Sequence, residues 1–513
     1  MSDKRSIQKI LIANRGEIAV RIIRTSHEMG MRSVAVYSDV DRTAPHVRMA
    51  DEAYHVGASP SSESYLRQER LIAIAKDSGS DAIHPGYGFL AENADFAEKC
   101  EKAEIRFIGP PAEAIRMMGD KTAARAMMRE AGVPMAPGTV DSIEDADEAL
   151  ILADEIGFPV LIKAAAGGGG KGMRIVHDSD SFHAAFEAAG REALSAFGDS
   201  RVFIEKYIVE PRHIEFQIMA DQQGNIVHLF ERECSIQRRH QKVIEEAPSP
   251  IMTPQLRKQM GQAAIDAARS CGYVGAGTVE FLVDADGKFY FMEMNTRLQV
   301  EHAVTEWITG LDLVRIQILI AEGCVLPWKQ EDLSIHGHSI ECRIYAEDPS
   351  NNFLPGPGLL VRHQTPDGFG VRVDSGVEQG DEVSTHYDPM ISKVTSWGAD
   401  RSKAIERMRR ALREYEIAGV PTTISFCLFV LEHESFRSGI FSTHFVDQHF
   451  NGRPKHDHDP GFEEILAKAA VSIWSPGSSL SEASRNGSEP TVNNGFSSWR
   501  KNRGRPRRLP RSD

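Results

Sequence analysis

The first hundred residues alternate between short apolar runs and a helical pattern. Residues 9–13 (KILIA) form one apolar run, isoleucines at positions 18, 22 and 23 share a helical face, and residues 33–38 form a second run. Strand, helix and strand in this order, with short connections, predict a parallel α/β layer. Residues 81–93 continue with a strand and a turn rich in glycine and proline, and residues 107–110 are the last strand expected in this unit.

The middle of the chain predicts a helix followed by strands. Alanine and methionine recur at helical spacing over residues 121–131, and the sequence VPMAPG then interrupts the helix. Residues 158–176 have the pattern of a strand, a glycine-rich hairpin and a second strand, and residues 201–208 predict a further strand. Residues 294–306 are dense in polar side chains and show little helical or strand periodicity, whereas strand and helix patterns alternate again over residues 338–449.

Beyond residue 450 the character of the chain changes. Residues 475–494 are rich in serine, asparagine, glycine and glutamate, and the end of the chain is strongly basic. Such a segment offers little apolar surface to offset the entropy lost on ordering. We expect a disordered or loosely docked tail, whose basic tip is either solvated or in contact with an acidic partner.

Composition narrows the class of protein. Of the 513 residues, 41% are hydrophobic and 26% are charged, as in an ordinary globular protein with room for about three domains. The net charge of -14 argues against nucleic-acid binding, and no apolar run approaches the ~20 residues that span a membrane. The six scattered cysteines include no CxxC pair, and the short polar N-terminus lacks a signal peptide. We therefore expect a cytoplasmic protein.

The glycine-rich hairpin is a candidate phosphate-binding loop. In residues 166–172 (AGGGGKG), the glycines allow backbone amides to approach phosphate oxygens. Lys163 ends the strand before the loop, and Lys121 and Lys206 supply cations on nearby elements. A flexible surface hairpin is the alternative for a glycine run taken alone. The spacing does not fit the GxxxxGK[ST] phosphate-binding loop, and the first strand–helix turn lacks a GxGxxG dinucleotide motif.

A predicted β-hairpin with its turn at residues 284–287 carries two carboxylates and an amide. With this turn, Glu293 falls opposite Thr278, and Glu280 is its diagonal neighbour on the same face. Asn295 follows on that face. Carboxylate and amide oxygens suit Mg²⁺, and a divalent cation would relieve the repulsion between the two carboxylates. A solvent-facing acidic patch is the alternative.

Two polar runs add candidate ligands for oxyanions and candidate bases. Arg297 can bind an oxyanion in bidentate fashion, and Glu301 and His302 are possible bases. Residues 238–242 (RRHQK) place four potential cations within five positions. Such a run is usually a solvated face, but an acidic enzyme that uses anionic substrates needs a local cluster of cations.

Taken together, these segments resemble the biotin carboxylase family of the ATP-grasp superfamily. The resemblance is collinear over about residues 7–450. The matching stretches are KILIANRGEIAVRIIR, HPGYGFLAEN, FIGP, MGDK, IKAAAGGGGKGM, EKYI, PRHIE, ECSIQRRHQKVIEEAP, EFLV, EMNTRLQVEH, GHSIECRIYAEDP and LPGPG.

The resemblance implies an α/β fold of the ATP-grasp type. It implies an N-terminal parallel α/β domain at residues 1–118 and an ATP-grasp domain at 119–330, with a mobile glycine-rich lid at about 135–207. A mixed α+β C-terminal domain at 331–450 and a polar, partly disordered basic tail at 451–513 would follow. Ala166 and Lys171 depart from the residues of many members, and neither position is a proposed ligand.

The resemblance also implies the roles of individual residues. Glu280, Glu293 and Asn295 would hold Mg²⁺ or Mn²⁺. Glu301 would be the base that deprotonates bicarbonate, and Arg343 would stabilise the biotin enolate, with Arg297 as a third catalytic residue. Bicarbonate would be bound by Lys242, Arg297, Gln299 and Val300, and ATP by Lys121, Lys163, Gly169, Gly170, Glu205, Lys206, Ile208, His213 and His240.

The implied reaction carboxylates biotin at the expense of ATP. Bicarbonate attacks the γ-phosphoryl group of ATP, which gives carboxyphosphate and ADP. Carboxyphosphate releases CO₂ and phosphate, the phosphate takes the ureido proton of biotin, and the biotin enolate attacks CO₂. The sequence contains no AMKM-type attachment motif, so the biotin is expected on a separate biotin carboxyl carrier protein. The implied partners also include carboxyltransferase subunits, together with a second copy of this chain.

The resemblance leaves the final carboxyl acceptor open. We expect acetyl-CoA or propionyl-CoA, as in an acyl-CoA carboxylase of fatty acid biosynthesis, and a split pyruvate carboxylase is the alternative. A different ATP-grasp ligase, such as a purine-biosynthesis carboxylase or one half of a carbamoyl phosphate synthetase, is a further alternative. A catalytically inactive nucleotide-binding scaffold would lack some of the proposed catalytic residues, all of which are present here.

Overall fold

The computed structural model describes residues 6–139, 142–164, 173–197, 199–239 and 241–452, without the side chains of residues 121, 122, 196 and 197. Four of the predicted ATP ligands are not described, in whole or in their side chain. Gly169, Gly170 and His240 lie outside the described residues, as does the side chain of Lys121. The predicted basic tip of the tail also lies outside them.

The N-terminal part is a parallel five-stranded sheet with the order β3-β2-β1-β4-β5, which confirms the predicted parallel α/β layer. Alternate residues of β1 face opposite sides. Ile10 and Ile12 pack with α1 and α11, whereas Leu11 packs with α3 and α4. The strands are β1 (Lys9–Ile12), β2 (Arg32–Ser38), β3 (Glu52–Gly57), β4 (Ala82–His84) and β5 (Arg106–Phe107), and the helices are α1 (Gly16–Glu28), α2 (Pro45–Met49), α3 (Gln68–Ser78), α4 (Ala94–Lys102) and α11 (Leu313–Ala321).

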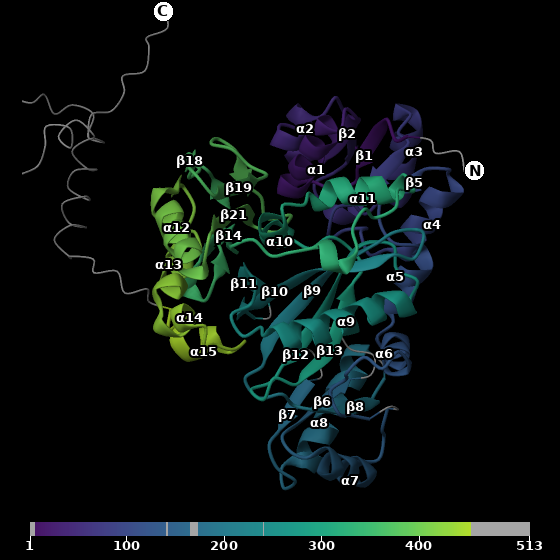
Figure 1. Cartoon of the computed structure of the whole chain (residues 1–513), viewed down its shortest axis with the longest axis vertical. Helices are drawn as coiled ribbons and strands as arrows, with labels where there is room; N and C mark the ends of the chain where they lie inside the picture. Colours follow the sequence, from purple (N-terminus) through teal and green to yellow (C-terminus); the bar gives the residue numbers. More distant parts are fainter. Residues whose placement is uncertain (1–5, 140–141, 165–172, 198, 240, 453–513) are drawn as a thin grey trace, which may run out of the picture. The chain divides into compact units, whose positions relative to one another are not determined.

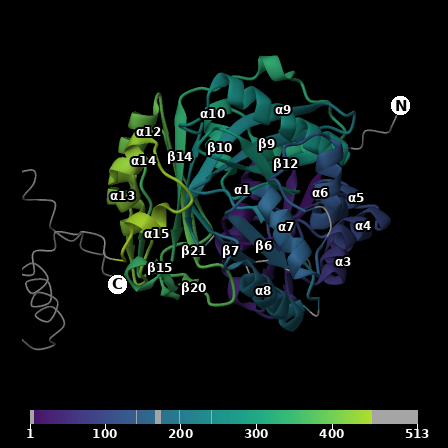
Figure 2. The same cartoon turned by 90° about the horizontal axis from the view of Figure 1, so that it is seen from below.

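The central sheet has eight strands in the order β13-β12-β9-β10-β11-β14-β21-β19 (Figure 1). Helix α9 packs on β9 and β10, and α12 packs on β21 and β14 (Figure 2). The strands are β9 (Arg212–Ala220), β10 (Ile226–Arg238), β11 (Gln241–Ala247), β12 (Gly275–Val283), β13 (Phe289–Asn295), β14 (His338–Tyr345), β19 (Val371–Ser375) and β21 (Met390–Gly398), and the helices are α9 (Pro254–Ser270), α12 (Arg401–Glu414), α13 (Ile424–Glu432), α14 (Glu434–Ser438) and α15 (Phe445–His449).

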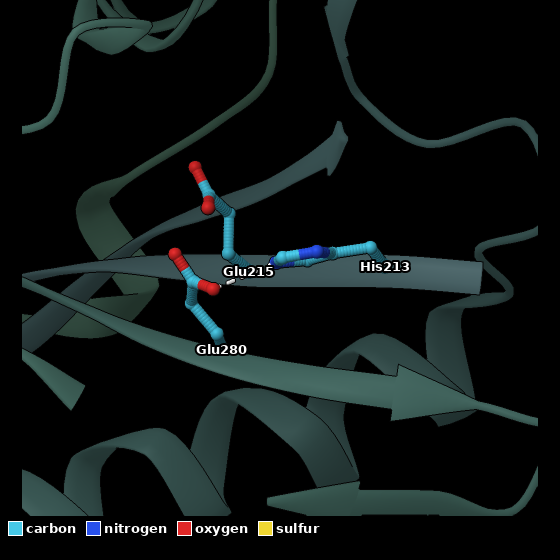
Figure 3. A group of neighbouring side chains, drawn as sticks. All are labelled: His213, Glu215 and Glu280. Atoms are coloured by element: carbon cyan, nitrogen blue, oxygen red, sulfur yellow. Dashed lines mark ion pairs between the residues drawn. The ribbon is translucent and has the colours of Figure 1, made fainter. Parts of the chain in front are cut away.

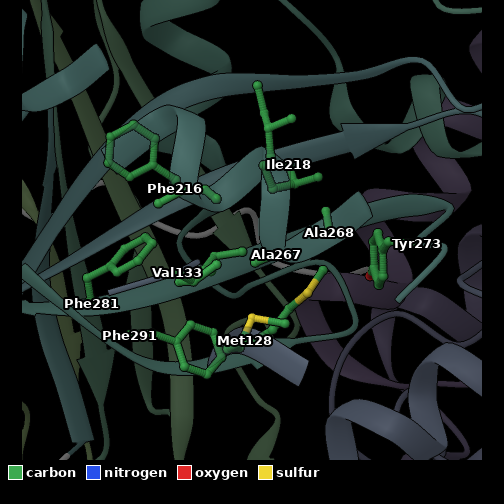
Figure 4. Close-up of a cluster of buried hydrophobic side chains, with 14 of the residues drawn as sticks. Met128, Val133, Phe216, Ile218, Ala267, Ala268, Tyr273, Phe281 and Phe291 are labelled. Atoms are coloured by element: carbon green, nitrogen blue, oxygen red, sulfur yellow. The ribbon is translucent and has the colours of Figure 1, made fainter. Parts of the chain in front are cut away.

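A hydrophobic cluster under this sheet fixes α9 against the strands (Figure 4). Phe216 and Ile218 of β9 and Phe281 of β12 meet the alanine-rich face of α9 around Ala267. Because alanines allow a helix to approach a sheet closely, the opposite face of these strands is held in a defined place. That opposite face carries the polar residues of the site.

A separate three-stranded antiparallel sheet, β7-β6-β8, has its own hydrophobic core with α7 and α8. It coincides with the region where a glycine-rich hairpin is expected. Helices α5 and α6 precede it. The elements are α5 (Ala112–Gly119), α6 (Lys121–Glu130), α7 (Ala146–Ile156), β6 (Val160–Ala164), β7 (Met173–Val176), α8 (Phe182–Phe197) and β8 (Val202–Lys206).

The remaining elements are short. Within the described part of the chain, no helix has both the length and the apolar character needed to cross a membrane. These elements are β15 (Glu347–Asp348), β16 (Leu354–Pro355), β17 (Gly358–Leu359), β18 (Arg362–Gln364), β20 (Glu382–Val383), β22 (Glu416–Ala418), and the 3₁₀ turns η1 (Asp39–Asp41), η2 (Ser61–Glu63), η3 (Gln330–Asp332) and η4 (Pro349–Asn351).

The hairpin β12–β13 forms as predicted, but its register is different. Glu280 lies directly opposite Glu293, and Thr278 lies opposite Asn295. The expected pairing of Thr278 with Glu293 is therefore wrong. The backbone amide of Asp284 donates to the carbonyl oxygen of Lys288, which closes a turn of three residues. A bulge follows Glu280. The turn and the bulge each move the register by one residue from the predicted pairing. Two shifts of one residue keep both carboxylates on the same face.

The polar run 294–306, which showed little periodicity, ends in a helix. Helix α10 (His302–Thr309) begins directly after Glu301, which is its N-cap residue. Most of the helix is buried, including polar residues such as His302 and Thr305. Polar residues are buried along this helix together with apolar ones, so the division into polar and apolar positions did not reveal its buried surface.

Candidate active site

Neighbouring strands of the central sheet and the loop 296–301 converge on one buried carboxylate. Glu301 is fully buried and accepts hydrogen bonds from Lys242 Nζ at 2.8 Å and Arg343 Nη2 at 3.0 Å. Lys242 lies on β11, and Arg343 lies on the adjacent strand β14. The structure therefore brings together three predicted site residues that are up to 101 positions apart, the separation of Lys242 and Arg343.

Lys242 lies among three carboxylates. Its Nζ is 2.5 Å from Glu215, 2.9 Å from Glu280 and 2.8 Å from Glu301. Burial alone would lower the pKa of the ammonium group, but these neighbours outweigh it and raise the pKa of Lys242 well above its ordinary value. Lys242 therefore stays charged and gives this buried region a fixed positive charge.

The carboxylates around Lys242 respond differently to burial. Burial raises the pKa of Glu301, but Lys242 and Arg343 outweigh this effect and hold its pKa well below the ordinary range. The pKa of Glu280 is also lowered, because Lys242 and His213 outweigh burial. For Glu215, burial dominates and the pKa is raised despite Arg232 and Lys242. Glu301 is thus ionised at neutral pH.

Arg343 stands between the carboxylates and a cavity. Its Nη2 lies 2.5 Å from Glu245 as well as 3.0 Å from Glu301. Burial raises the pKa of Glu245 to about 7, against the lowering by Arg343. Arg343 lines a cavity of about 410 Å³, together with Arg297, Val300 and Tyr87. A guanidinium that two carboxylates hold at a cavity wall is well placed to bind an anionic ligand there.

Arg297 is held by the N-terminal part of the molecule. Its Nε donates to Glu92 at 2.7 Å, and its other nitrogens donate to Asn295 at 3.1 Å and Gln299 at 3.2 Å. The side chain is 19% exposed, so it still reaches the cavity. Gln299 is buried and donates to Glu280 at 3.3 Å. The loop 296–301 therefore contributes the polar side chains of Arg297, Gln299 and Glu301 to the site around Lys242.

The predicted metal ligands lie together on the hairpin. Glu280 and Glu293 face each other across β12 and β13, and Asn295 donates to Glu280 at 2.9 Å. Oxygen ligands of this kind fit Mg²⁺. A second cluster shares Glu280: His213, Glu215 and Glu280 offer ligand atoms within 4.8 Å of one another (Figure 3). There, however, the Lys242 ammonium lies within 2.9 Å of both carboxylates and occupies part of the space between them.

The predicted ATP residues fall on two parts of the fold. Lys163 and Glu205 form an ion pair of 2.5 Å between β6 and β8, and the pKa of Glu205 is lowered because Lys163 and Arg125 outweigh burial. Lys206 donates to the backbone carbonyl groups of residues 157 and 158. Ile208 is buried just beyond β8. His213 belongs to the central sheet, where its Nε2 lies 2.8 Å from Glu280.

Several residues of this site were missed from the sequence. Arg232 is fully buried and bonds to Glu215 at 2.5 Å, and Gln237 contacts His213 at 2.8 Å. A signal existed in β9, where His213, Glu215 and Gln217 recur at every second position among apolar residues. In β10 three charged residues, 231–233, follow one another, so alternation gives no signal for Arg232. A buried strand with such a polar row needs partners inside the protein. The missed residues are Glu92, Glu215, Arg232, Gln237 and Glu245.

Comparison with known families covers most of the described chain. Residues 6–115 match the biotin carboxylase N-terminal domain, residues 120–329 match the ATP-binding domain of the carbamoyl-phosphate synthase L chain, and residues 341–448 match the biotin carboxylase C-terminal domain. Together with the sheet topology and the hairpin carboxylates, these matches define an ATP-grasp enzyme.

Individual relatives narrow this class. The chain is 54% identical to biotin carboxylase 1 of Bacillus subtilis over 86% of this chain and 98% of the relative. It is 56% identical to a pyruvate carboxylase subunit from Methanothermobacter thermautotrophicus, over 86% and 90%. A solved biotin carboxylase from Campylobacter jejuni, in complex with an ATP analogue, is 48% identical and covers 86% of this chain and 99% of its own, with a TM-score of 0.82. The chain belongs to the biotin carboxylase family, as its sequence motifs predicted.

Proposed function

We propose that this chain uses ATP and bicarbonate to carboxylate biotin that is carried on a separate biotin carboxyl carrier protein. The observation that carries the proposal is the position of Glu301. It is a fully buried carboxylate held between Lys242 and Arg343, and Arg343 and the neighbouring Val300 line the cavity. A buried base beside two cations suits the deprotonation of a small anion such as bicarbonate.

Bicarbonate would lie against Lys242, Arg297, Gln299 and Val300. Lys242 and Arg343 keep the pKa of Glu301 well below its ordinary value, which makes it a weak base. An anion bound to these cations would compete with Glu301 for them and raise its pKa. Glu301 would thus accept the bicarbonate proton only when the substrate is bound, and the bicarbonate oxygen would attack the γ-phosphoryl group of ATP.

Biotin would enter the cavity of about 410 Å³ beside Arg343. The guanidinium would bind the ureido oxygen and stabilise the negative charge that forms there when the ureido proton leaves. Because Arg343 is already oriented by Glu245 and Glu301, little reorganisation is needed at that step. The CO₂ released from carboxyphosphate would then react within the same enclosed space, which limits its loss to water.

ATP would lie between the β6–β8 sheet and the central sheet. Lys163, Glu205, Lys206, Ile208 and His213 are proposed to bind it, together with Lys121, Gly169, Gly170 and His240. Glu280, Glu293 and Asn295 would hold Mg²⁺ or Mn²⁺, and this metal would neutralise charge on the phosphate oxygens.

A second copy of this chain and a carrier protein are the proposed partners. A solved structure of a Hydrogenobacter thermophilus 2-oxoglutarate carboxylase, described as a biotin carboxylase domain dimer with MgADP, ADP and bicarbonate, is 48% identical and has a TM-score of 0.81. It covers 87% of this chain and 98% of its own. This likeness supports a homodimer, bicarbonate binding and Mg²⁺-dependent nucleotide binding here.

For the final carboxyl acceptor, acetyl-CoA or propionyl-CoA transferred by a carboxyltransferase is our proposal. Pyruvate is the alternative, and one relative supports it, since the chain spans most of the Methanothermobacter pyruvate carboxylase subunit. A different ATP-grasp ligase is less well supported, because both flanking domains match biotin carboxylase models. Affinity purification of the tagged chain from its own cells would identify the partner transferase and thereby decide between an acyl-CoA and pyruvate.

ADP release by the purified chain tests the proposed half-reaction. We expect release to require bicarbonate and to increase when free biotin is added, because biotin draws off the carboxyl group. ADP release that proceeds equally without bicarbonate would contradict the proposal.

A further inference from the structure

Lys393 of β21 is a fully buried lysine to which no substrate role has been given. Its Nζ donates a hydrogen bond to the backbone carbonyl oxygen of Val300 at 2.6 Å and lies 3.1 Å from Glu17. Burial lowers the pKa of Lys393, but neighbouring carboxylates led by Glu17 outweigh it and raise the pKa above its ordinary value. A buried ammonium group is costly unless it is paired, so its partners fix its position.

The Val300 carbonyl belongs to the peptide that joins Val300 to Glu301. A peptide group is planar, so the orientation of this carbonyl also sets the orientation of the Glu301 amide. Residues 300 and 301 lie in a turn, in which the His302 amide donates to the Gln299 carbonyl oxygen at 3.4 Å. The hydrogen bond from Lys393 is shorter, at 2.6 Å, and it holds the peptide at the centre of that turn. The hydrogen bond from Lys393 therefore helps to fix the backbone that joins Gln299 to Glu301, and the side chains of both residues belong to the site.

The other partner of Lys393 is itself firmly placed. Glu17 lies in the first turn of α1, and Tyr87 donates a hydrogen bond to its carboxylate. Gly376 packs so closely on this turn that a Cβ atom there would collide with the backbone nitrogen of Glu17. Glu17 and Lys393 thus form a rigid buried link from the N-terminal part of the molecule to the loop 296–301.

We propose that Lys393 is a positioning residue for bicarbonate. It holds the Val300–Glu301 peptide so that Glu301 and the Val300 backbone meet the anion in the productive orientation. The inference deepens the proposed function and rests on it. ATP makes no contact with this peptide in the proposed arrangement, so bicarbonate use depends on Lys393 and ATP binding does not.

The test compares Lys393→Met with Lys393→Arg and Lys403→Met. Methionine keeps the length of the side chain without its charge, arginine restores a cationic donor, and Lys403 is an exposed lysine of α12, 65% exposed, that serves as the matched control. Lys393→Met combined with Glu17→Gln removes the carboxylate that would otherwise be left buried without its cation, so that loss of folding does not obscure the result.

Steady-state ADP release gives the first readout. For Lys393→Met and for the double variant, we expect the KM for bicarbonate to rise about tenfold or more, as loss of a hydrogen bond to a charged donor implies, with the KM for ATP within about twofold of the parent. Lys393→Arg should recover part of the loss, and Lys403→Met should match the parent. An equal rise of both KM values, or an unchanged KM for bicarbonate in a folded Lys393→Met protein, would overturn the inference.

Hydrogen–deuterium exchange separates this inference from the proposed function. In Lys393→Met, the backbone of residues 296–304 should exchange faster than in the parent and in Lys403→Met. If the parent shows no bicarbonate-dependent ADP release but exchange in this segment rises, the proposed function fails and the positioning role stands. If release is normal and exchange and KM are both unchanged, only the role of Lys393 fails.

Discussion

At the scale of single residues, the buried charged side chains around Glu301 determine how the site is arranged. Lys242 contacts three carboxylates and Arg343 contacts two, so each cation orients several groups at once. Glu301 is the carboxylate that both cations share. Its removal should therefore affect the chemistry more than the folding, because Lys242 keeps Glu215 and Glu280 as partners.

Replacing the proposed base should greatly reduce turnover without unfolding the protein. In Glu301→Gln we expect bicarbonate-dependent ADP release to fall by about 100-fold or more, the contribution typical of a general base. Steady-state kinetics and circular dichroism would measure activity and folding, with the exposed Glu331→Gln as a control. Turnover by Glu301→Gln equal to that of the parent would show that this carboxylate is not the base.

Residue patterns predicted part of this site. The carboxylates of the hairpin could be placed on one face from alternation alone, because two register shifts cancel with respect to the face. The contacts of Lys242 could not be predicted in this way, since its partners come from strands distant in sequence. The roles of Glu301 and Arg343 were proposed from family resemblance rather than from periodicity or composition.

At the scale of elements, buried ion pairs join helices of the C-terminal part to the central sheet. Glu246 of β11 accepts from Arg401 of α12 at 2.7 and 2.9 Å, and it lies 2.7 Å from His338 of β14. Arg401 also donates to the carbonyl oxygen of Phe436 in α14 at 2.7 Å. Glu246 therefore links two strands and, through Arg401, two helices.

This link predicts a defined dependence of stability on pH. Although burial raises the pKa of Glu246, His338 and Arg401 outweigh it and lower the pKa from 4.5 to about 2. A lowered pKa in the folded state stabilises the protein above the unfolded-state value, here by roughly 3 kcal/mol. That contribution is complete above about pH 5 and is lost progressively as the pH falls from about 4.5 towards 2.

Urea unfolding of Glu246→Gln at several pH values would measure this contribution. We expect the variant to be less stable than the parent at pH 7, and the difference to shrink between about pH 5 and 3. The exposed Glu101→Gln should match the parent throughout. A difference that stays constant over this range would show that the carboxylate does not titrate as its surroundings predict.

At the scale of the whole described chain, several hydrophobic cores underlie the predicted parts, and one of them is shared. The β6–β8 sheet packs on α7 and α8 around Phe182, Ile162 and Ile204. The N-terminal sheet has a core of its own on one face, and on the other face it shares a core with residues of β9, β10 and β12. The predicted division at residue 330 stays a proposal. Strands β14, β21 and β19 from beyond that residue extend the same sheet as β9–β13, a continuity that sequence patterns cannot reveal because strand pairing is non-local.

Nucleotide binding should change the dynamics of the β6–β8 sheet selectively. Lys163 and Lys206 would exchange their internal partners for phosphate oxygens, which ties this sheet to the ligand. We expect a nonhydrolysable ATP analogue with Mg²⁺ to slow hydrogen–deuterium exchange in residues 160–164 and 202–208, and to leave β1 and β2 unchanged. Equal slowing across all of these strands, or none in β6 and β8, would count against ATP binding at this sheet.

The central proposal is that a carboxyl group passes from bicarbonate to biotin. The most direct measurement incubates the chain with ¹⁴C-bicarbonate, ATP, Mg²⁺ and free biotin and follows label in carboxybiotin, trapped at alkaline pH. We predict label that requires ATP, appears in proportion to ADP, and forms about 100-fold or more slowly with Glu301→Gln. Release of ADP without any label in biotin would contradict the proposal.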